Sequence, residues 1–197
     1  MKTLDEDIKR CVDFHGHLCP GLALGIVASR AGLWELGVPR AGDEEVVSII
    51  ETDACCADAV QVLSGSTFGK GNFIYKDVGK VAVTFISRER EKSVRLCLKP
   101  GAVELSDVHK ALIAKVMDES ATEAETADFW AHHRTKAEEI LFTPWSALFS
   151  MKAAPPDMPP KARVEPSLPC DQCGEPVMAS KRQQVNGKSL CYTCCEA

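Results

Sequence analysis

The chain has 197 residues, of which 45% are hydrophobic and 26% charged, and its formal net charge is −5. This length suits one domain of ordinary size plus a small module, and the acidic balance excludes a strongly basic nucleic-acid binder. No apolar run approaches the roughly 20 residues that span a bilayer, and the N-terminus lacks the apolar segment of a secretory signal. We therefore expect a cytoplasmic protein that binds neither membrane nor nucleic acid, and whose ten cysteines are free thiols or metal ligands.

The first half of the chain predicts two helices, then a strand and a third helix. A capping-box pattern at residues 3–6 opens a helix that reaches residue 13. Residues 20–36 form a second, largely apolar helix between Pro20 and Gly37, which we expect to be central, with Gly21 and Gly25 allowing another backbone to approach. Residues 46–51 predict a strand, and residues 54–63 a helix capped by Asp53.

The second half predicts a strand meander followed by two helices. The strands cover residues 73–76, 80–87 and 94–99, and the helices cover residues 106–119 and 122–141. Strands in the middle and helices at both ends predict an α+β core domain, with a mixed helix and antiparallel-sheet structure, over residues 1–152. Residues 153–160 contain four prolines, which predict an extended linker over residues 153–166 and a separate module over residues 167–197.

The C-terminal module carries two C-x2-C pairs, formed by Cys170 with Cys173 and by Cys191 with Cys194. Two such pairs typically supply the four thiolates of a structural Zn2+ site in a zinc ribbon or treble clef, although a redox dithiol pair has the same residues. The segment has too few large apolar residues to fold on its own core, so zinc is expected to stabilise it. Acidic residues outnumber basic ones in this segment, which again disfavours nucleic acid.

The core domain contains a second candidate metal site. His15, His17 and Cys19 alternate along the chain, so an extended segment would present all three to one side. Cys19 also precedes a predicted helix, whose N-terminus would lower its thiol pKa and make it a metal ligand or a nucleophile. Cys55 lies in the first turn of another predicted helix and could complete the same metal or redox site. A plain alternative is a histidine that only binds a backbone carbonyl.

Other polar positions give weaker indications. The glycine-rich segment 64–72 lacks the spacing of a phosphate-binding P-loop, but Lys70 within it is a candidate contact for an anionic ligand or cofactor. Three further histidines, at positions 109, 132 and 133, are expected to be ordinary surface or partly buried side chains of the C-terminal helices.

Four stretches together resemble a known family, FmdE, which is named for one of the subunits of formylmethanofuran dehydrogenase. They are residues 14–25, which read FHGHLCPGLALG, and residues 51–65, 67–72 and 77–80. The resemblance implies an α+β core, a homodimer, and a metal near the His/Cys motif held by His17, Cys19 and Cys55, with His15 close by. It also implies an accessory role in a molybdenum or tungsten enzyme that interconverts CO2 and formylmethanofuran. This sequence departs from the family at Ser66, where many members have a cysteine.

These observations lead to two functional hypotheses. The first is a metal-binding accessory protein of a molybdenum/tungsten formylmethanofuran dehydrogenase type system, with the subunits of that enzyme as partners. It would hold structural zinc in the tail and a second transition metal (Zn, Ni or Fe) in the core. The alternative is a free-standing redox or hydrolytic enzyme, in which a metal or a thiolate at His17, Cys19 and Cys55 performs the chemistry.

Overall fold

The computed structural model describes residues 2–155 and 158–196, which divide into two compact units. The first unit, residues 1–161, is called the core domain here, and the second, residues 162–197, the tail module. The finer boundaries expected from the sequence, with a linker over residues 153–166, remain a prediction.

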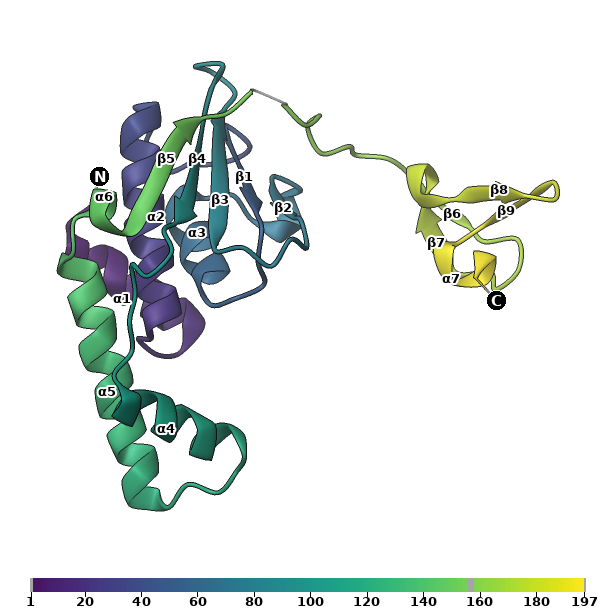
Figure 1. Cartoon of the computed structure of the whole chain (residues 1–197). Helices are drawn as coiled ribbons and strands as arrows, with labels where there is room; N and C mark the ends of the chain where they lie inside the picture. The colour runs from purple at the N-terminus through teal and green to yellow at the C-terminus, as the bar shows by residue number, and fades with distance from the viewer. Residues whose placement is uncertain (1, 156–157, 197) are drawn as a thin grey trace. The chain divides into compact units, whose positions relative to one another are not determined.

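The core domain is built on a five-stranded sheet in the order β2-β1-β3-β4-β5 (Figure 1). The strands are β1 (Val46–Ile50), β2 (Phe73–Tyr75), β3 (Ala82–Ser87), β4 (Lys92–Leu98) and β5 (Phe149–Ala153). β1 is parallel to β2 and antiparallel to β3, and the β3-β4-β5 pairs are antiparallel. The α+β class is confirmed.

The predicted meander of three consecutive strands is wrong. β2 pairs with β1 instead of β3, because helix α3 (Cys56–Ser64) returns the chain to the free edge of β1. The segment after β2 then passes the end of β1, where the Lys80 amide donates to the Glu51 carbonyl, and β3 pairs on the other side. The edge strand β5 was not predicted from the sequence.

Two N-terminal helices follow the predicted signals closely. Helix α1 (Leu4–His15) begins at the Thr3–Glu6 capping box and ends at Gly16. Helix α2 (Pro20–Leu36) has the predicted bounds, and Gly37 ends it with a positive φ of 67°. α2 is the central helix: it packs against α3 on one side and against β3 and β4 on another, and most of its residues are buried. The prediction of a buried central helix is confirmed.

Helix α3 lies directly against α2 because α2 has a glycine at the contact. A methyl group on Gly25 would collide with the Cys56 backbone, which confirms the predicted close approach. The predicted cap of α3 is wrong: Asp53 is exposed, and Cys55 is the N-cap residue, with no side-chain capping bond. The loop residue Thr52 instead accepts a hydrogen bond from the Ala54 amide, so the helix starts later than expected.

The remaining elements of the core domain are a helical hairpin and two short turns. Helices α4 (Asp107–Met117) and α5 (Glu123–Phe142) form the hairpin, which extends away from the sheet (Figure 1). The C-terminal half of α5 packs on α2 through Ala137, Ile140 and Leu141, which are buried. The short turns are the 3-10 helix η1 (Phe68–Lys70) and helix α6 (Trp145–Leu148). None of the described helices is long and apolar enough to cross a membrane.

The tail module consists of two small hairpins and a helical turn. The hairpins are β6 (Ser167–Pro169) with β7 (Pro176–Met178) and β8 (Gln183–Val185) with β9 (Lys188–Leu190). A 3-10 turn η2 (Ala179–Lys181) and helix α7 (Tyr192–Cys195) complete it. Among its described residues the buried apolar cluster contains only Cys170, Leu190 and Cys191, which is too small a core to fold unaided.

Candidate metal centres

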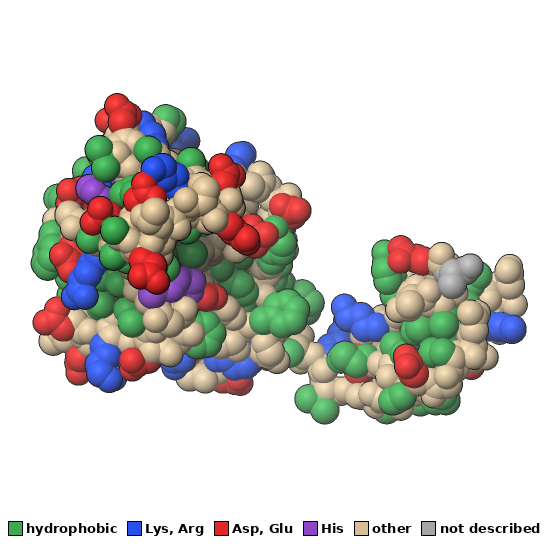
Figure 2. Space-filling model, turned by 90° about the horizontal axis from the view of Figure 1, so that it is seen from below, with side chains coloured by type: hydrophobic (Ala, Val, Ile, Leu, Met, Phe, Trp, Pro, Cys, Tyr) green, Lys and Arg blue, Asp and Glu red, His purple; other side chains and the backbone are tan. Residues whose placement is uncertain are grey.

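The junction of α1 and α2 brings three donor side chains together. His15 is the last residue of α1, Gly16 turns the chain with a φ of 97°, and Cys19 is the N-cap residue of α2. The donor atoms of His15, His17 and Cys19 all lie within 4.8 Å of one another. We call this group the core site. Figure 2 shows histidine side chains at the surface of the core domain beside hydrophobic side chains.

The distances at the core site suit a metal ion. Cys19 Sγ lies 3.8 Å from His15 Nε2, near the roughly 3.5 Å that separates nitrogen and sulfur ligands around tetrahedral zinc. The other ring nitrogen, His15 Nδ1, lies 2.7 Å from Asp58 Oδ2 on α3. This carboxylate can hold the proton on Nδ1, which leaves the Nε2 lone pair directed to the site. Asp58 was not assigned a role from the sequence.

The predicted low pKa of Cys19 is wrong. Burial raises the pKa of the Cys19 thiol to about 11, although the Leu22 amide, 3.3 Å from Sγ, acts in the opposite direction. Desolvation outweighs the helix N-terminus here because Cys19 is only 4% exposed. Burial also lowers the pKa of His17, which favours the neutral imidazole that binds metals.

Cys55 lies beside the core site without joining its cluster. It precedes α3 and sits against Gly21 in the first turn of α2. Its thiol interacts with that of Cys19 and contributes to the raised pKa of Cys19. The set of donors that lie within 4.8 Å of one another nevertheless contains His15, His17 and Cys19, and Cys55 is outside it. Its role as a ligand stays a prediction.

All five histidines belong to one series of contacting rings. His17 packs edge-on against Trp130 with ring centroids 5.1 Å apart, and Trp130 contacts His133. His133 Nδ1 lies 2.6 Å from His109 Nε2, and His132 stacks on His109. His109 is only 2% exposed, so the expectation of a surface or partly buried side chain is wrong for this residue. The α4–α5 hairpin buries it, and helix periodicity alone does not reveal which neighbour that hairpin meets.

Two other predicted positions have structural contacts. The Lys70 ammonium group donates to the carbonyls of Gly42 and Asp43, so its role in binding a ligand remains a prediction. Ser66 is fully buried, and its hydroxyl accepts a bond from Ser48 and donates to the Val46 carbonyl. The residue that replaces the family's frequent cysteine therefore belongs to a buried hydroxyl network.

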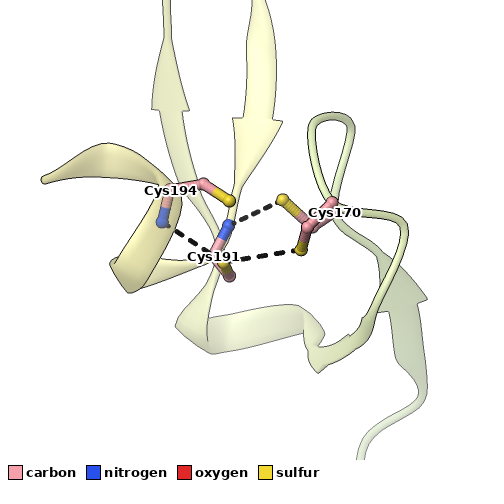
Figure 3. A group of neighbouring side chains, drawn as sticks. Cys170, Cys191 and Cys194 are labelled. Carbon is pink, nitrogen blue, oxygen red and sulfur yellow. Dashed lines mark hydrogen bonds between the residues drawn. The ribbon is translucent and has the colours of Figure 1, made fainter. Parts of the chain in front are cut away.

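The tail module brings its four paired cysteines to one point. The sulfurs of Cys170, Cys173, Cys191 and Cys194 lie within 4.8 Å of one another. Cys170, Cys191 and Cys194 converge from the two ends of the module, and the amides of Cys191 and Cys194 point at neighbouring sulfurs (Figure 3). The 3.9 Å between the Cys173 and Cys191 sulfurs is close to the roughly 3.8 Å edge of a tetrahedral zinc–thiolate site.

Backbone amides prepare Cys170 for metal binding. Hydrogen bonds from the amides of Cys173, Cys191 and Gln172 lower the pKa of Cys170 to about 6. At neutral pH this sulfur is therefore largely a thiolate, the form that binds zinc. Cys195 lies outside the cluster, as expected for a spare thiol.

Comparison with known proteins agrees with these two parts. A family model described as "FmdE, Molybdenum formylmethanofuran dehydrogenase operon" matches residues 14–150. A second model, described as "Prokaryotic dksA/traR C4-type zinc finger", matches residues 164–197.

Two known proteins are similar over nearly the whole chain. A protein of Archaeoglobus fulgidus described as "Probable S-adenosyl-L-methionine-binding protein" is 29% identical over 204 residues, covering 98% of this chain and 54% of that protein. The chain thus spans about half the length of this relative. The crystal structure of an FmdE-like protein of tungsten formylmethanofuran dehydrogenase from Syntrophus aciditrophicus shares the fold, with a TM-score of 0.60 at 20% identity and coverage of 98% and 92%. Because the first family model matches well over half of the sequence, the chain belongs to the FmdE family, with a C4-type zinc finger at its C-terminal end.

Proposed function

We propose that the protein is a metal-binding accessory protein of a molybdenum/tungsten formylmethanofuran dehydrogenase type system. A transition metal would bind at His15, His17 and Cys19, with Cys55 as the nearest further thiol, while zinc in the tail module stabilises that module. Family membership supports the enzyme system, and the core site supports metal binding. We include a homodimer, a reducing cytoplasmic setting and the molybdenum- or tungsten-containing subunits as partners.

The observation that carries the proposal is the arrangement of His15 between Asp58 and Cys19. A carboxylate on one ring nitrogen and a thiol near the other is the pattern that orients a metal-binding histidine. Two imidazoles and one thiolate suit zinc, nickel or iron. The raised pKa of Cys19 is consistent with this, because a bound cation would itself stabilise the thiolate.

A free-standing metal-dependent enzyme is the alternative function. Three protein ligands leave a coordination position open, and a metal there can act as a Lewis acid toward water or substrate. Trp130 and Leu18 line a surface cavity of about 550 Å³ that includes His17, so a small substrate could reach this side of the core site. Binding to the large subunits of the molybdenum or tungsten enzyme in a pull-down would favour the accessory role; a stable homodimer without partners would favour the enzyme.

Metal analysis of purified variants tests the core site. We expect about two metal ions per wild-type chain and about one in the His17→Ala/Cys19→Ala variant. Cys97→Ala is the matched control, since Cys97 lies on β4 and belongs to neither cluster. A wild-type chain with a single metal that is lost only in Cys191→Ser would refute the core site. S-adenosylmethionine, which the description of the Archaeoglobus relative names, is a further ligand to test by calorimetric titration.

A further inference from the structure

A second cavity of the core domain is lined mainly by basic side chains. It has a volume of about 510 Å³ and includes residues of α1, α2 and α3 and of the loop after α2. Its walls contain four cationic side chains, one carboxylate and three apolar residues: Lys2, Arg10, Arg30 and Arg40, then Asp7, then Leu33, Pro39 and Leu63. We call this cavity the arginine pocket. It shares no residue with the core site.

The backbone holds two of the arginines close together. Arg10 Nη2 and Arg40 Nε both donate to the Val62 carbonyl, at 3.1 and 2.9 Å. Arg40 also donates to the Ala41 carbonyl at 3.2 Å. Two guanidinium groups on one carbonyl oxygen repel each other, and a neutral acceptor does not cancel their charge.

A single carboxylate serves the charges of the pocket. Asp7 forms ion pairs with Arg30 and, at 3.6 Å, with Arg10, and it is 6% exposed. Among the described residues that line the cavity, Asp7 is the one acidic side chain, against four cationic ones. The pocket therefore carries a surplus of positive charge, and backbone carbonyls fix part of it in position.

We propose that the arginine pocket binds a small molecule through a phosphate group. The surplus charge favours a dianionic group over a single carboxylate, and guanidinium groups match phosphate oxygens with paired N–H donors. Leu33, Pro39 and Leu63 offer an apolar wall for the organic part. The volume lies within the range of small-molecule sites and exceeds what a phosphate ion alone needs.

Calorimetric titration of the full chain tests this proposal with three probes: phenyl phosphate, inorganic phosphate and benzoate. We expect phenyl phosphate to bind most tightly, inorganic phosphate more weakly, and benzoate weakest. Arg40→Gln should weaken phenyl phosphate binding by about tenfold or more, because it removes a charged hydrogen-bond donor. Arg90→Gln, an exposed change in the β3–β4 turn, should leave binding unchanged.

Several results would overturn the proposal. Absence of phenyl phosphate binding, or binding that both Arg40→Gln and Arg10→Gln leave unchanged in folded protein, would remove the site. Benzoate binding as tight as phenyl phosphate would refute the preference for a dianion. Equal binding of phenyl phosphate and inorganic phosphate would refute the role of the apolar wall. Asp7→Asn adds an opposite test, since removing the carboxylate should tighten phosphate binding.

Discussion

Replacing Gly25 by alanine is expected to destabilise the core domain, because α2 and α3 touch at this residue. The added methyl group would lie 2.8 Å from both the Cys56 Cα and the Ala59 Cβ, and closer still to the Cys56 carbonyl oxygen. Two of these three atoms are backbone, so no side-chain rotation relieves the collision. Helix α3 would have to move away from α2, and Asp58 would move with it.

The expected loss is about 2 kcal/mol in the free energy of unfolding. Overpacking a core costs about 1–3 kcal/mol, and we expect the upper part of this range because backbone atoms are involved. Alanine is favoured over glycine in a helix interior by about 1 kcal/mol, which offsets part of the cost. For a domain of this size the net loss corresponds to a decrease of roughly 4–8 °C in melting temperature.

Urea unfolding followed by tryptophan fluorescence measures this change in the core domain. All three tryptophans, at positions 34, 130 and 145, belong to that unit, so the tail module does not contribute. Gly69→Ala is the matched control, because no heavy atom lies within 4 Å of a methyl group there. If Gly25→Ala is as stable as the wild type, the close approach of α2 and α3 does not constrain this position, and the reasoning is refuted.

Three further changes follow from other contacts. Chelating the zinc, or Cys191→Ser, should unfold the tail module and leave the core domain intact, as NMR spectra would show; a tail that keeps its dispersed signals without metal would contradict this. Ser66→Ala should lower the free energy of unfolding by about 1–2 kcal/mol, since its buried hydroxyl bonds that of Ser48; an unchanged urea midpoint would contradict a stabilising network. Two hydrogen bonds from Arg95 lower the pKa of Glu51, so its stabilisation is complete above about pH 5 and is lost as the pH falls toward the lowered value. Glu51→Gln should therefore show a shallower loss of stability in acid than the wild type, and parallel curves would argue against this pair.

Local signals in the sequence predicted much of the fold. The bounds of α2 follow from Pro20, which cannot donate in the first turn, and from Gly37, which adopts the left-handed conformation at the end. The capping box at Thr3 located the start of α1 for the same kind of reason. Strand order was not predictable in this way. β2 is a short strand of three residues, and its partner depends on where α3 returns the chain.

The two metal sites show the same division. In the tail, each C-x2-C pair places two sulfurs near each other within one turn, so the residues alone predict a four-thiolate site. In the core, the spacing of His15, His17 and Cys19 also indicated a cluster, since the three lie within five consecutive residues. The thiol pKa was not predictable, because desolvation of Cys19 depends on the elements that cover it.

The sequence by itself determined which residues form the local clusters, where most helices begin and end, and the family. Only the tertiary structure decided the contacts between distant segments. His15 meets Asp58 across 43 residues, and His109 meets His133 across 24. The arginine pocket likewise exists only where α1, α2 and α3 converge. Capping and ligand spacing act over a few residues of covalent chain, whereas these partners are selected by how whole helices pack, which no local pattern encodes.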